Sequence, residues 1–241
     1  MKMNEQLEPI KGKAGLTMEK RSVALDGPAG AGKSTLAKRA AKHFGLIYVD
    51  TGALYRCIGL FAFRNNIESR DREGVTALLP QLELEMKYDD EGVQRMWLCG
   101  EDVTDAIRMP EISTYASDVS AMPEVRAFLL SMQRDMAETY DIIMDGRDIG
   151  TVVLPNAGLK IFITANEKAR ANRRYLELIE KGVKTTLEEV LNEMISRDKN
   201  DSEREIAPLK AADDAIILDT SDLDFDESFV ALCKLIEEKL L

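Results

Sequence analysis

Residues 25–35 read Leu-Asp-Gly-Pro-Ala-Gly-Ala-Gly-Lys-Ser-Thr and fit the pattern G-x-x-x-x-G-K-[ST]. An apolar run precedes the pattern at 23–25, and a helix-like stretch, 35–44, follows it. Glycines let such a loop curl until several backbone N–H groups point at a phosphate, and the following helix directs its positive dipole end at the same anion. The arrangement predicts a strand, a phosphate-binding loop and a helix, in that order.

The loop also carries the side chains that a nucleoside triphosphate needs. Lys33 supplies a mobile positive charge for the β- and γ-phosphate oxygens, and the Ser34 hydroxyl can ligate Mg²⁺. A glycine-rich turn without a ligand is the alternative, but strand, spacing and helix all favour binding. We therefore predict that the following residues bind the triphosphate: Gly27, Pro28, Ala29, Gly30, Ala31, Gly32, Lys33, Ser34 and Thr35.

The composition narrows the class of protein. The chain has 241 residues, of which 45% are hydrophobic and 31% charged, as in ordinary globular proteins. The net charge of −11 disfavours a nucleic-acid partner, which usually requires a basic face, although local arginine clusters can coexist with an acidic total. No apolar run approaches the roughly 20 residues that span a membrane, so we expect no membrane partner.

The N-terminal stretch and the cysteines indicate a cytoplasmic protein, and we expect a monomer. Residues 1–17 lack periodicity and the apolar core of a signal peptide, so we expect a flexible extension or an alternative start at Met18. With His43 as the only histidine, no zinc site is available. Three scattered cysteines without a C-x-x-C pair are typical of reduced thiols: Cys57, Cys99 and Cys233.

Short apolar runs alternate with amphipathic stretches along most of the chain. The runs expected to form strands are 22–26, 46–49, 141–145, 159–164 and 215–219. The stretches expected to form helices are 33–44, 52–65, 123–139, 166–181, 186–199 and 225–240. This alternation predicts an α/β fold, a P-loop parallel sheet flanked by helices, whose ligands bind beyond the carboxyl ends of the strands.

Residues 66–122 break this rhythm. The stretch 82–88 alternates apolar and polar residues, 89–92 is a turn, and 93–98 follows as a second short strand, which predicts an antiparallel hairpin. The simplest account is a small β-containing lobe inserted between two core segments, 20–65 and 123–241.

Asp145 ends the apolar run 142–144, as an aspartate that helps to hold Mg²⁺ opposite a phosphate-binding loop would. Many buried strands also end in Asp as a helix cap or turn former, so this alternative stays open. A GTPase would need an Asn-Lys-x-Asp guanine reader, which the chain lacks. The match of Asp89–Gly92 to D-x-x-G falls in the predicted turn and is accidental.

Arginines cluster where phosphates are expected. Arg197, Asp201 and Arg204 share one helix face if the helix runs that far. The alternative pairs the charges on a solvated surface with Glu167, Glu177, Glu193 or Asp198. Arg170 and Arg174 stand at i and i+4 of another expected helix, where like charges repel unless an anion lies between them, so the set favours transfer of a phosphoryl group to a phosphate acceptor. Its other members are Arg56, Arg147, Arg170, Arg173 and Arg174.

The chain resembles the bacterial cytidylate (CMP) kinase family over about residues 20–240. The motifs that carry this resemblance are Gly27-Pro-Ala-Gly-Ala-Gly-Lys-Ser34, Asp50-Thr-Gly-Ala-Leu-Tyr-Arg56, Gly100-Glu-Asp-Val-Thr-Asp-Ala-Ile-Arg108, Asp145-Gly-Arg-Asp-Ile-Gly-Thr-Val-Val153 and Arg197-Asp-Lys-Asn-Asp-Ser-Glu-Arg204. The resemblance implies a P-loop core, a nucleoside-monophosphate lobe at 66–122 and a helical lid at about 166–205. It also implies that ATP and Mg²⁺ convert CMP or dCMP to the diphosphate.

The resemblance also implies a role for each matching residue. Ser117, Arg126 and Asp148 would bind the cytosine ring. Arg56 and Arg147 would hold the CMP phosphate, with Thr51 nearby, and Asp201 and Arg204 would bind the ribose and phosphate end. The catalytic set would comprise Lys33, Arg147, Arg170, Arg174 and Arg197, and the metal ligands would be Ser34 and Asp145.

The choice of cytosine is consistent with these roles. A carboxylate such as Asp148 can accept a hydrogen bond from the N4 amino group of cytosine, while Arg126 donates to the acceptor edge. Uracil would place an oxygen against the carboxylate, and an unpaired buried polar group costs about 1–3 kcal/mol. Two alternatives stay open: a P-loop kinase with another acceptor, such as UMP, AMP or shikimate, and a non-catalytic nucleotide-binding switch.

Overall fold

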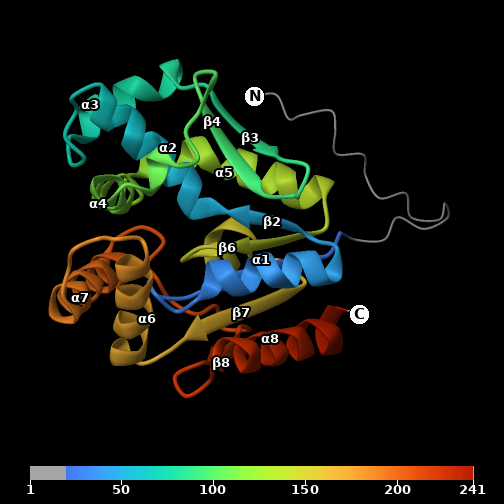
Figure 1. The fold of residues 1–241 in the computed structure, drawn as a ribbon. Coiled ribbons are helices and arrows are strands. Elements are labelled where there is room, and N and C mark those ends of the chain that lie inside the picture. The colour runs from blue at the N-terminus through green and yellow to red at the C-terminus, as the bar shows by residue number, and fades with distance from the viewer. Residues whose placement is uncertain (1–19, 241) are drawn as a thin grey trace. The chain divides into compact units, whose positions relative to one another are not determined.

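A computed structural model describes residues 20–240, which form two compact units (Figure 1). The first, here called the loop unit, comprises residues 22–48 and 142–240 and carries the glycine-rich loop. The second, here called the hairpin unit, comprises residues 20–21 and 49–141. The extension expected at residues 1–17 lies outside the described residues.

The loop unit is built on a parallel sheet. Its strands are β1 (Ser22–Asp26), β6 (Ile142–Asp145), β7 (Leu159–Thr164) and β8 (Ile216–Asp219), and the strand order of the sheet is β2-β6-β1-β7-β8. Strand β2 (Ile47–Asp50) begins in this unit. The strand β1 pairs in parallel with β6 on one side and with β7 on the other. The strands β1, β6 and β7 are largely buried on both faces, and the parallel sheet with its helices confirms the predicted α/β fold.

Helices α1 (Lys33–Phe44) and α8 (Phe225–Leu240) pack on this sheet through apolar stripes. Helices α6 (Glu167–Glu180) and α7 (Leu187–Glu203) pack on each other around Ala171, Val190 and Met194. Helix α1 buries Leu36, Ala37 and Ala40 in one cluster with Leu232 and Ile236 of α8, beside which it lies in Figure 1. The structure confirms the expected strands and helices of this unit to within one or two residues, with one exception at the end of α7.

Helix α7 is longer than expected, and the position of its end determines whether Arg204 is helical. A capping box of Thr186 and Glu189 begins it, and it continues to Glu203 rather than to residue 199. Arg204 follows the last helical residue in an extended conformation, with φ −62° and ψ 139°. Arg204 was expected to share a helix face with Arg197 and Asp201 only if the helix ran that far, and this condition is not met because α7 ends at Glu203.

The hairpin unit contains the expected antiparallel strands, β3 (Leu84–Tyr88) and β4 (Gln94–Leu98), in register at Met86 and Met96. A third short strand, β5 (Glu101–Asp102), extends the sheet. The helices are α2 (Thr51–Arg64), α3 (Arg72–Leu78), α4 (Pro110–Val119) and α5 (Pro123–Thr139). Packing does not test where a lobe is inserted, so the limits 66–122 and 166–205 stay predictions.

Two further observations concern the described residues as a whole. The helices of residues 20–240 include none with the length and hydropathy of a membrane span. All three cysteines fall within this range and each is free, as expected; Cys57 and Cys233 are buried, and Cys99 is exposed.

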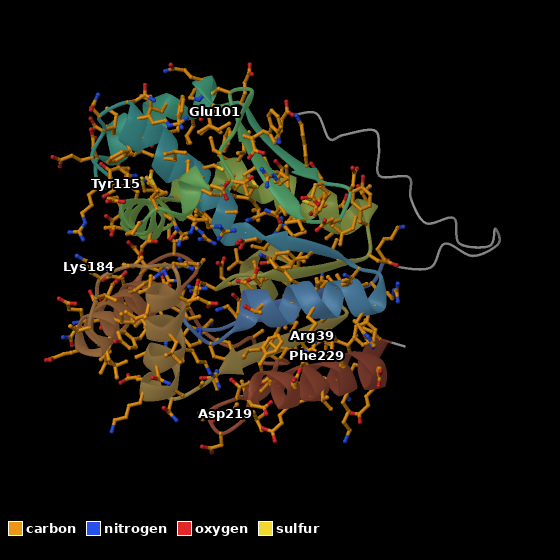
Figure 2. All side chains as sticks on the ribbon, in the orientation of Figure 1. Arg39, Glu101, Tyr115, Lys184, Asp219 and Phe229 are labelled. Atoms are coloured by element: carbon orange, nitrogen blue, oxygen red, sulfur yellow. The ribbon has the colours of Figure 1, made fainter. Side chains whose placement is uncertain are left out.

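We expect Gly59→Ala to destabilise the protein. Gly59 lies where α2 packs on α4, and a Cβ there would approach Tyr115 Cβ to 2.9 Å and the Ala116 nitrogen to 3.2 Å; Figure 2 labels Tyr115. The free energy of unfolding, measured by urea denaturation, should fall by about 1–3 kcal/mol because the two helices must separate. In an open helix the same change would stabilise by roughly 0.5–1 kcal/mol, so an increase would contradict the predicted packing.

Candidate active site

The glycine-rich loop joins β1 to α1 and depends on glycine at its first position. Gly27 has φ 147°, and a Cβ at this residue would lie 2.0 Å from the carbonyl oxygen of Ile163 on β7. Gly32 precedes α1 with φ 81° and provides no side-chain cap. The N-terminal N–H groups of a helix without a side-chain cap are well suited to bind an anion.

Lys33 is buried in a crowd of positive charge. Its Nζ donates a hydrogen bond to the Pro28 carbonyl oxygen at 2.8 Å, and the side chain is 5% exposed. Burial lowers the pKa of Lys33 well below its ordinary 10.5, and the neighbouring guanidinium groups of Arg147 and Arg197 lower it further. Asp145 and Asp26 oppose this shift without reversing it. A polyanion placed here would relieve the repulsion.

Ser34 and Asp145 face each other, as expected of a magnesium site. The Ser34 hydroxyl donates to Asp145 Oδ2 at 2.7 Å, and the Tyr48 hydroxyl donates to Asp145 Oδ1 at 2.9 Å. The described residues contain no group of three or more acidic, histidine or cysteine side chains that could hold a metal alone. One carboxylate and one hydroxyl fit Mg²⁺, which takes few protein ligands and completes its shell with water and phosphate oxygens.

The arginines of the loop unit differ in how fully their guanidinium groups are paired within the protein. Arg147 donates from Nε to Asp201 Oδ2 at 2.9 Å, and Arg204 donates to Asp148 Oδ1 at 3.2 Å. Arg197 lies near both Arg147 and Lys33, and its Nε is buried without a hydrogen-bond partner. Burial lowers the pKa of Arg197, and Arg147 lowers it further, so this guanidinium is held in an electrostatically unfavourable place.

Two arginines of α6, Arg170 and Arg174, are paired within the protein. Arg170 is buried and donates to the carbonyl oxygens of Ala165, at 2.9 Å, and Ala29, at 2.8 Å, as well as to Asp198. Arg174 pairs with Glu177 at 2.8 Å on the surface. Asp198 and Glu177 are both among the acidic partners that a purely structural role would give to these arginines.

Asp198 also accepts a hydrogen bond from the Ala29 N–H at 3.1 Å, which sequence analysis did not anticipate. From the sequence, Asp198 was expected only as a partner for a surface arginine. The neighbouring Arg173 is structural, since it donates to the Thr220 hydroxyl and to the Leu223 carbonyl oxygen.

The hairpin unit holds the remaining four predicted site residues, two of them in the first half of α2. Thr51 is buried there, and Arg56 donates to the Ile107 carbonyl oxygen at 2.9 Å. Arg126 of α5 is buried, donates to the Ser120 carbonyl oxygen at 3.1 Å and lies 5.7 Å from the ring centroid of Tyr55. Ser117 lies on α4 and is partly buried.

Two residues of the hairpin unit escaped prediction. Asp50 caps α2 by accepting from the Ala53 N–H at 3.0 Å, and Arg108 donates to the other oxygen of Asp50 at 2.6 Å. Both residues stand in the motifs that carry the family resemblance. That membership was the signal that could have found them.

Asp26, the last residue of β1, was also missed. Its two carboxylate oxygens accept from the N–H groups of Ile149 and Gly150, each at 2.7 Å, and it is 4% exposed. Burial raises its pKa to about 6, the two N–H bonds and Lys33 oppose the shift, and Asp148 adds to it. The signal was available, because Asp26 ends an apolar strand as Asp145 does.

A family model described as cytidylate kinase matches residues 23–238. The chain belongs to the cytidylate kinase family. This confirms the resemblance seen in the motifs, and the match extends over both the loop unit and the hairpin unit.

Two relatives show how much of the chain the cytidylate kinase likeness covers. The chain is 50% identical to the cytidylate kinase of Caldicellulosiruptor bescii over 210 residues, which is 87% of this chain and 92% of that protein. It is 46% identical to the cytidylate kinase of Thermosipho melanesiensis over 217 residues, 90% of this chain and 97% of that one. A solved shikimate kinase from Bacteroides thetaiotaomicron, at 14% identity and a TM-score of 0.45, covers 90% of this chain and 98% of its own. That structural likeness is too slight to add to the fold described above.

We expect Asp26→Asn to change how stability depends on pH. The pKa of Asp26 is raised from 3.8 to about 6 in the folded protein, so ionising this carboxyl costs stability as the pH rises through that interval. Relative to the Asn variant, the free energy of unfolding of the wild type should fall by up to about 3 kcal/mol between these pH values. Urea denaturation at a series of pH values measures this difference. Parallel pH profiles for the two proteins would show that the carboxyl is not perturbed.

Proposed function

We propose that the chain transfers the γ-phosphoryl group of ATP to CMP or dCMP, giving ADP and CDP or dCDP. Family membership supplies the reaction class. The structural observation that carries the proposal is the cluster of Lys33, Arg147 and Arg197 beside the glycine loop, in which Lys33 is buried and the Nε atom of Arg197 is buried without a hydrogen-bond partner. Such a cluster is suited to binding two nucleotides, because together they bring several phosphate groups to one place.

The chemistry asks little of the protein beyond positioning and neutralising charge. We assign the triphosphate to the N–H groups of the glycine loop and to Lys33. Arg147 and Arg197 would bear on the transferring phosphoryl group, and Arg170 would act through its bonds to the loop carbonyl of Ala29. The acceptor is an ionised phosphate, so no general base is required.

Ser34 and Asp145 are proposed to hold Mg²⁺, which when bound supplies positive charge to the β- and γ-phosphate oxygens. The 2.7 Å contact between their oxygens supports this assignment, since both are hard donors on one spot. The Tyr48 hydroxyl orients the carboxylate through its bond to the second oxygen.

The acceptor nucleotide is assigned by matching position in the family motifs. We propose that Asp148, Arg126 and Ser117 bind cytosine, with Asp148 accepting from the N4 amino group. The bond from Arg204 to Asp148 favours the ionised carboxylate that this role requires. The residues proposed for the phosphate and ribose are Thr51, Arg56, Arg147, Asp201 and Arg204.

Three further proposals concern the lid and the cellular setting. The helical lid, about 166–205 and so including Arg174, would close over the phosphoryl group to exclude water. The enzyme would act as a monomer in the cytoplasm. Its partners would be nucleotides alone, without nucleic acid or membrane.

We expect ADP release to be fastest with a cytidine nucleotide as acceptor. A coupled assay across CMP, dCMP, UMP, AMP and shikimate measures kcat/KM for each, and CMP should exceed UMP by roughly 10- to 150-fold. Faster turnover with UMP, AMP or shikimate would identify a different kinase. Nucleotide binding without ADP release with any acceptor would indicate a switch.

We expect Lys33→Ala to lower kcat at least about 100-fold while CMP still binds, because the charge lost is one aimed at the transferring phosphates. Turnover comes from the coupled assay and CMP binding from calorimetry. Lys42→Ala, a change at an exposed lysine near the far end of the same helix, is the matched control and should leave kcat unchanged. Retained activity in the Lys33 variant would remove this residue from the reaction.

Arg197 and Arg173 should separate function from stability. Arg197→Met removes a guanidinium whose Nε has no partner, so we expect kcat to fall by about 100-fold without a loss of thermal midpoint. Arg173→Met removes bonds to Thr220 and Leu223, so it should lower the thermal midpoint and leave kcat near the wild-type value. If both variants lose the same property, the assignment of the two arginines is wrong.

A further inference from the structure

One buried carboxylate ties the strand before the glycine loop to the segment that carries Asp148. Asp26 is the last residue of β1 and directly precedes Gly27. Its two oxygens accept from successive N–H groups, those of Ile149 and Gly150, at 2.7 Å each. Two short bonds to adjacent N–H groups fix the direction of the backbone as well as its position.

The fixed segment begins one residue after Asp148. Residues Ile149–Val153 form a π-helical turn in which the N–H groups of Val152 and Val153 donate to the Asp148 carbonyl oxygen, at 2.9 and 3.2 Å. The backbone of Asp148 itself is neither helical nor extended, with φ −145° and ψ 27°. Asp148 therefore directly precedes a turn whose first two N–H groups are bound by Asp26.

Gly150 shows how closely the two segments meet. A Cβ at this residue would lie 3.4 Å from Asp26 Oδ2 and 3.2 Å from Lys160 Cδ, both of which are buried. A displacement of the turn cannot be absorbed by empty space on that side. Any loosening of the Asp26 bonds would have to shift the turn and the residue before it.

The carboxylate is retained at a cost to stability. Burial raises its pKa to about 6, and the Asp148 carboxylate works in the same direction. Sites whose groups are held against their own stability are commonly those that serve function. Both oxygens of Asp26 accept backbone N–H bonds from Ile149 and Gly150, so we expect its effect to pass through the turn that follows Asp148.

We propose that Asp26 is a positioning residue for base recognition, which holds the backbone at Ile149 and Gly150 so that Asp148 is aimed at the cytosine amino group. This inference rests on the base-reading role proposed above for Asp148. It predicts that Asp26 affects the choice between CMP and UMP through Asp148 and not independently of it.

The test is a double-mutant cycle on acceptor preference. The ratio of kcat/KM for CMP to that for UMP is measured for the wild type, Asp26→Asn, Asp148→Ala and the double variant. Asp26→Asn keeps the volume but leaves one N–H without an acceptor, and we expect it to lower the ratio by about tenfold. In the Asp148→Ala background, the same change should lower the ratio no further.

Asp219→Asn is the matched control. Asp219 also ends a strand of the same sheet and accepts a backbone N–H bond, from Ser221 at 2.8 Å, but it lies at the exposed end of β8 (Figure 2). This variant should keep the wild-type ratio. Asp26→Ala, which removes both acceptors, should lower the ratio at least as far as Asp26→Asn, and circular dichroism of each variant checks that it is folded.

The outcomes distinguish the inference from the function on which it rests. A wild type that does not phosphorylate CMP overturns the proposed function. If Asp148→Ala lowers the ratio but Asp26→Asn does not, the function stands and the role of Asp26 is wrong. Equal losses from Asp26→Asn in the wild-type and Asp148→Ala backgrounds would also overturn that role, because they would make it independent of Asp148. An unchanged ratio in Asp148→Ala removes both residues from base reading.

Discussion

The loop unit is organised around three cationic side chains that lie close together beside the glycine loop. Lys33, Arg147 and Arg197 lie close enough together for each guanidinium to lower the pKa of the lysine. Burial of like charges is unfavourable in a protein interior, where the effective dielectric constant is low. The bonds from Arg147 to Asp201 and from Ser34 to Asp145 hold neighbouring side chains in place. Under the function proposed above, bound phosphates would offset the repulsion among these three cations.

Two aspartates at adjacent strand ends serve this centre in different ways. The register pairs Leu25 of β1 with Asp145 of β6, so Asp26 and Asp145 lie at the same carboxyl edge of the sheet. Asp145 accepts from two hydroxyl groups and presents oxygen toward the glycine loop. Asp26 accepts from two backbone N–H groups and holds the following turn. A parallel sheet makes this possible because all its strands end at one edge.

The arginines of α6 and α7 show where a pattern in the sequence stops being informative. Residue type and helical spacing do not distinguish four arginines from one another: Arg170, Arg173, Arg174 and Arg197. In the structure Arg170 binds loop carbonyl oxygens, Arg173 binds the segment after β8, Arg174 pairs on the surface with Glu177, and Arg197 keeps a buried nitrogen without a partner. The partners of Arg170 and Arg173 are distant in sequence, namely Ala29, Thr220 and Leu223. Helical spacing says which arginines share a face and nothing about what that face meets.

The α/β class, the order of strands and helices, the glycine loop and the family could all be predicted from the amino-acid sequence. Each of these follows from local patterns: apolar periodicity, glycine at positions of positive φ, and strand ends marked by aspartate. Three features become visible only in the folded chain: Asp26 binds the turn after Asp148, Arg204 lies beyond the end of α7, and the Nε atom of Arg197 is buried without a hydrogen-bond partner. These facts depend on contacts between segments more than a hundred residues apart or on where a helix ends. Hydrogen-bond partners and desolvation arise only once the chain has packed, so no local pattern of residues records them.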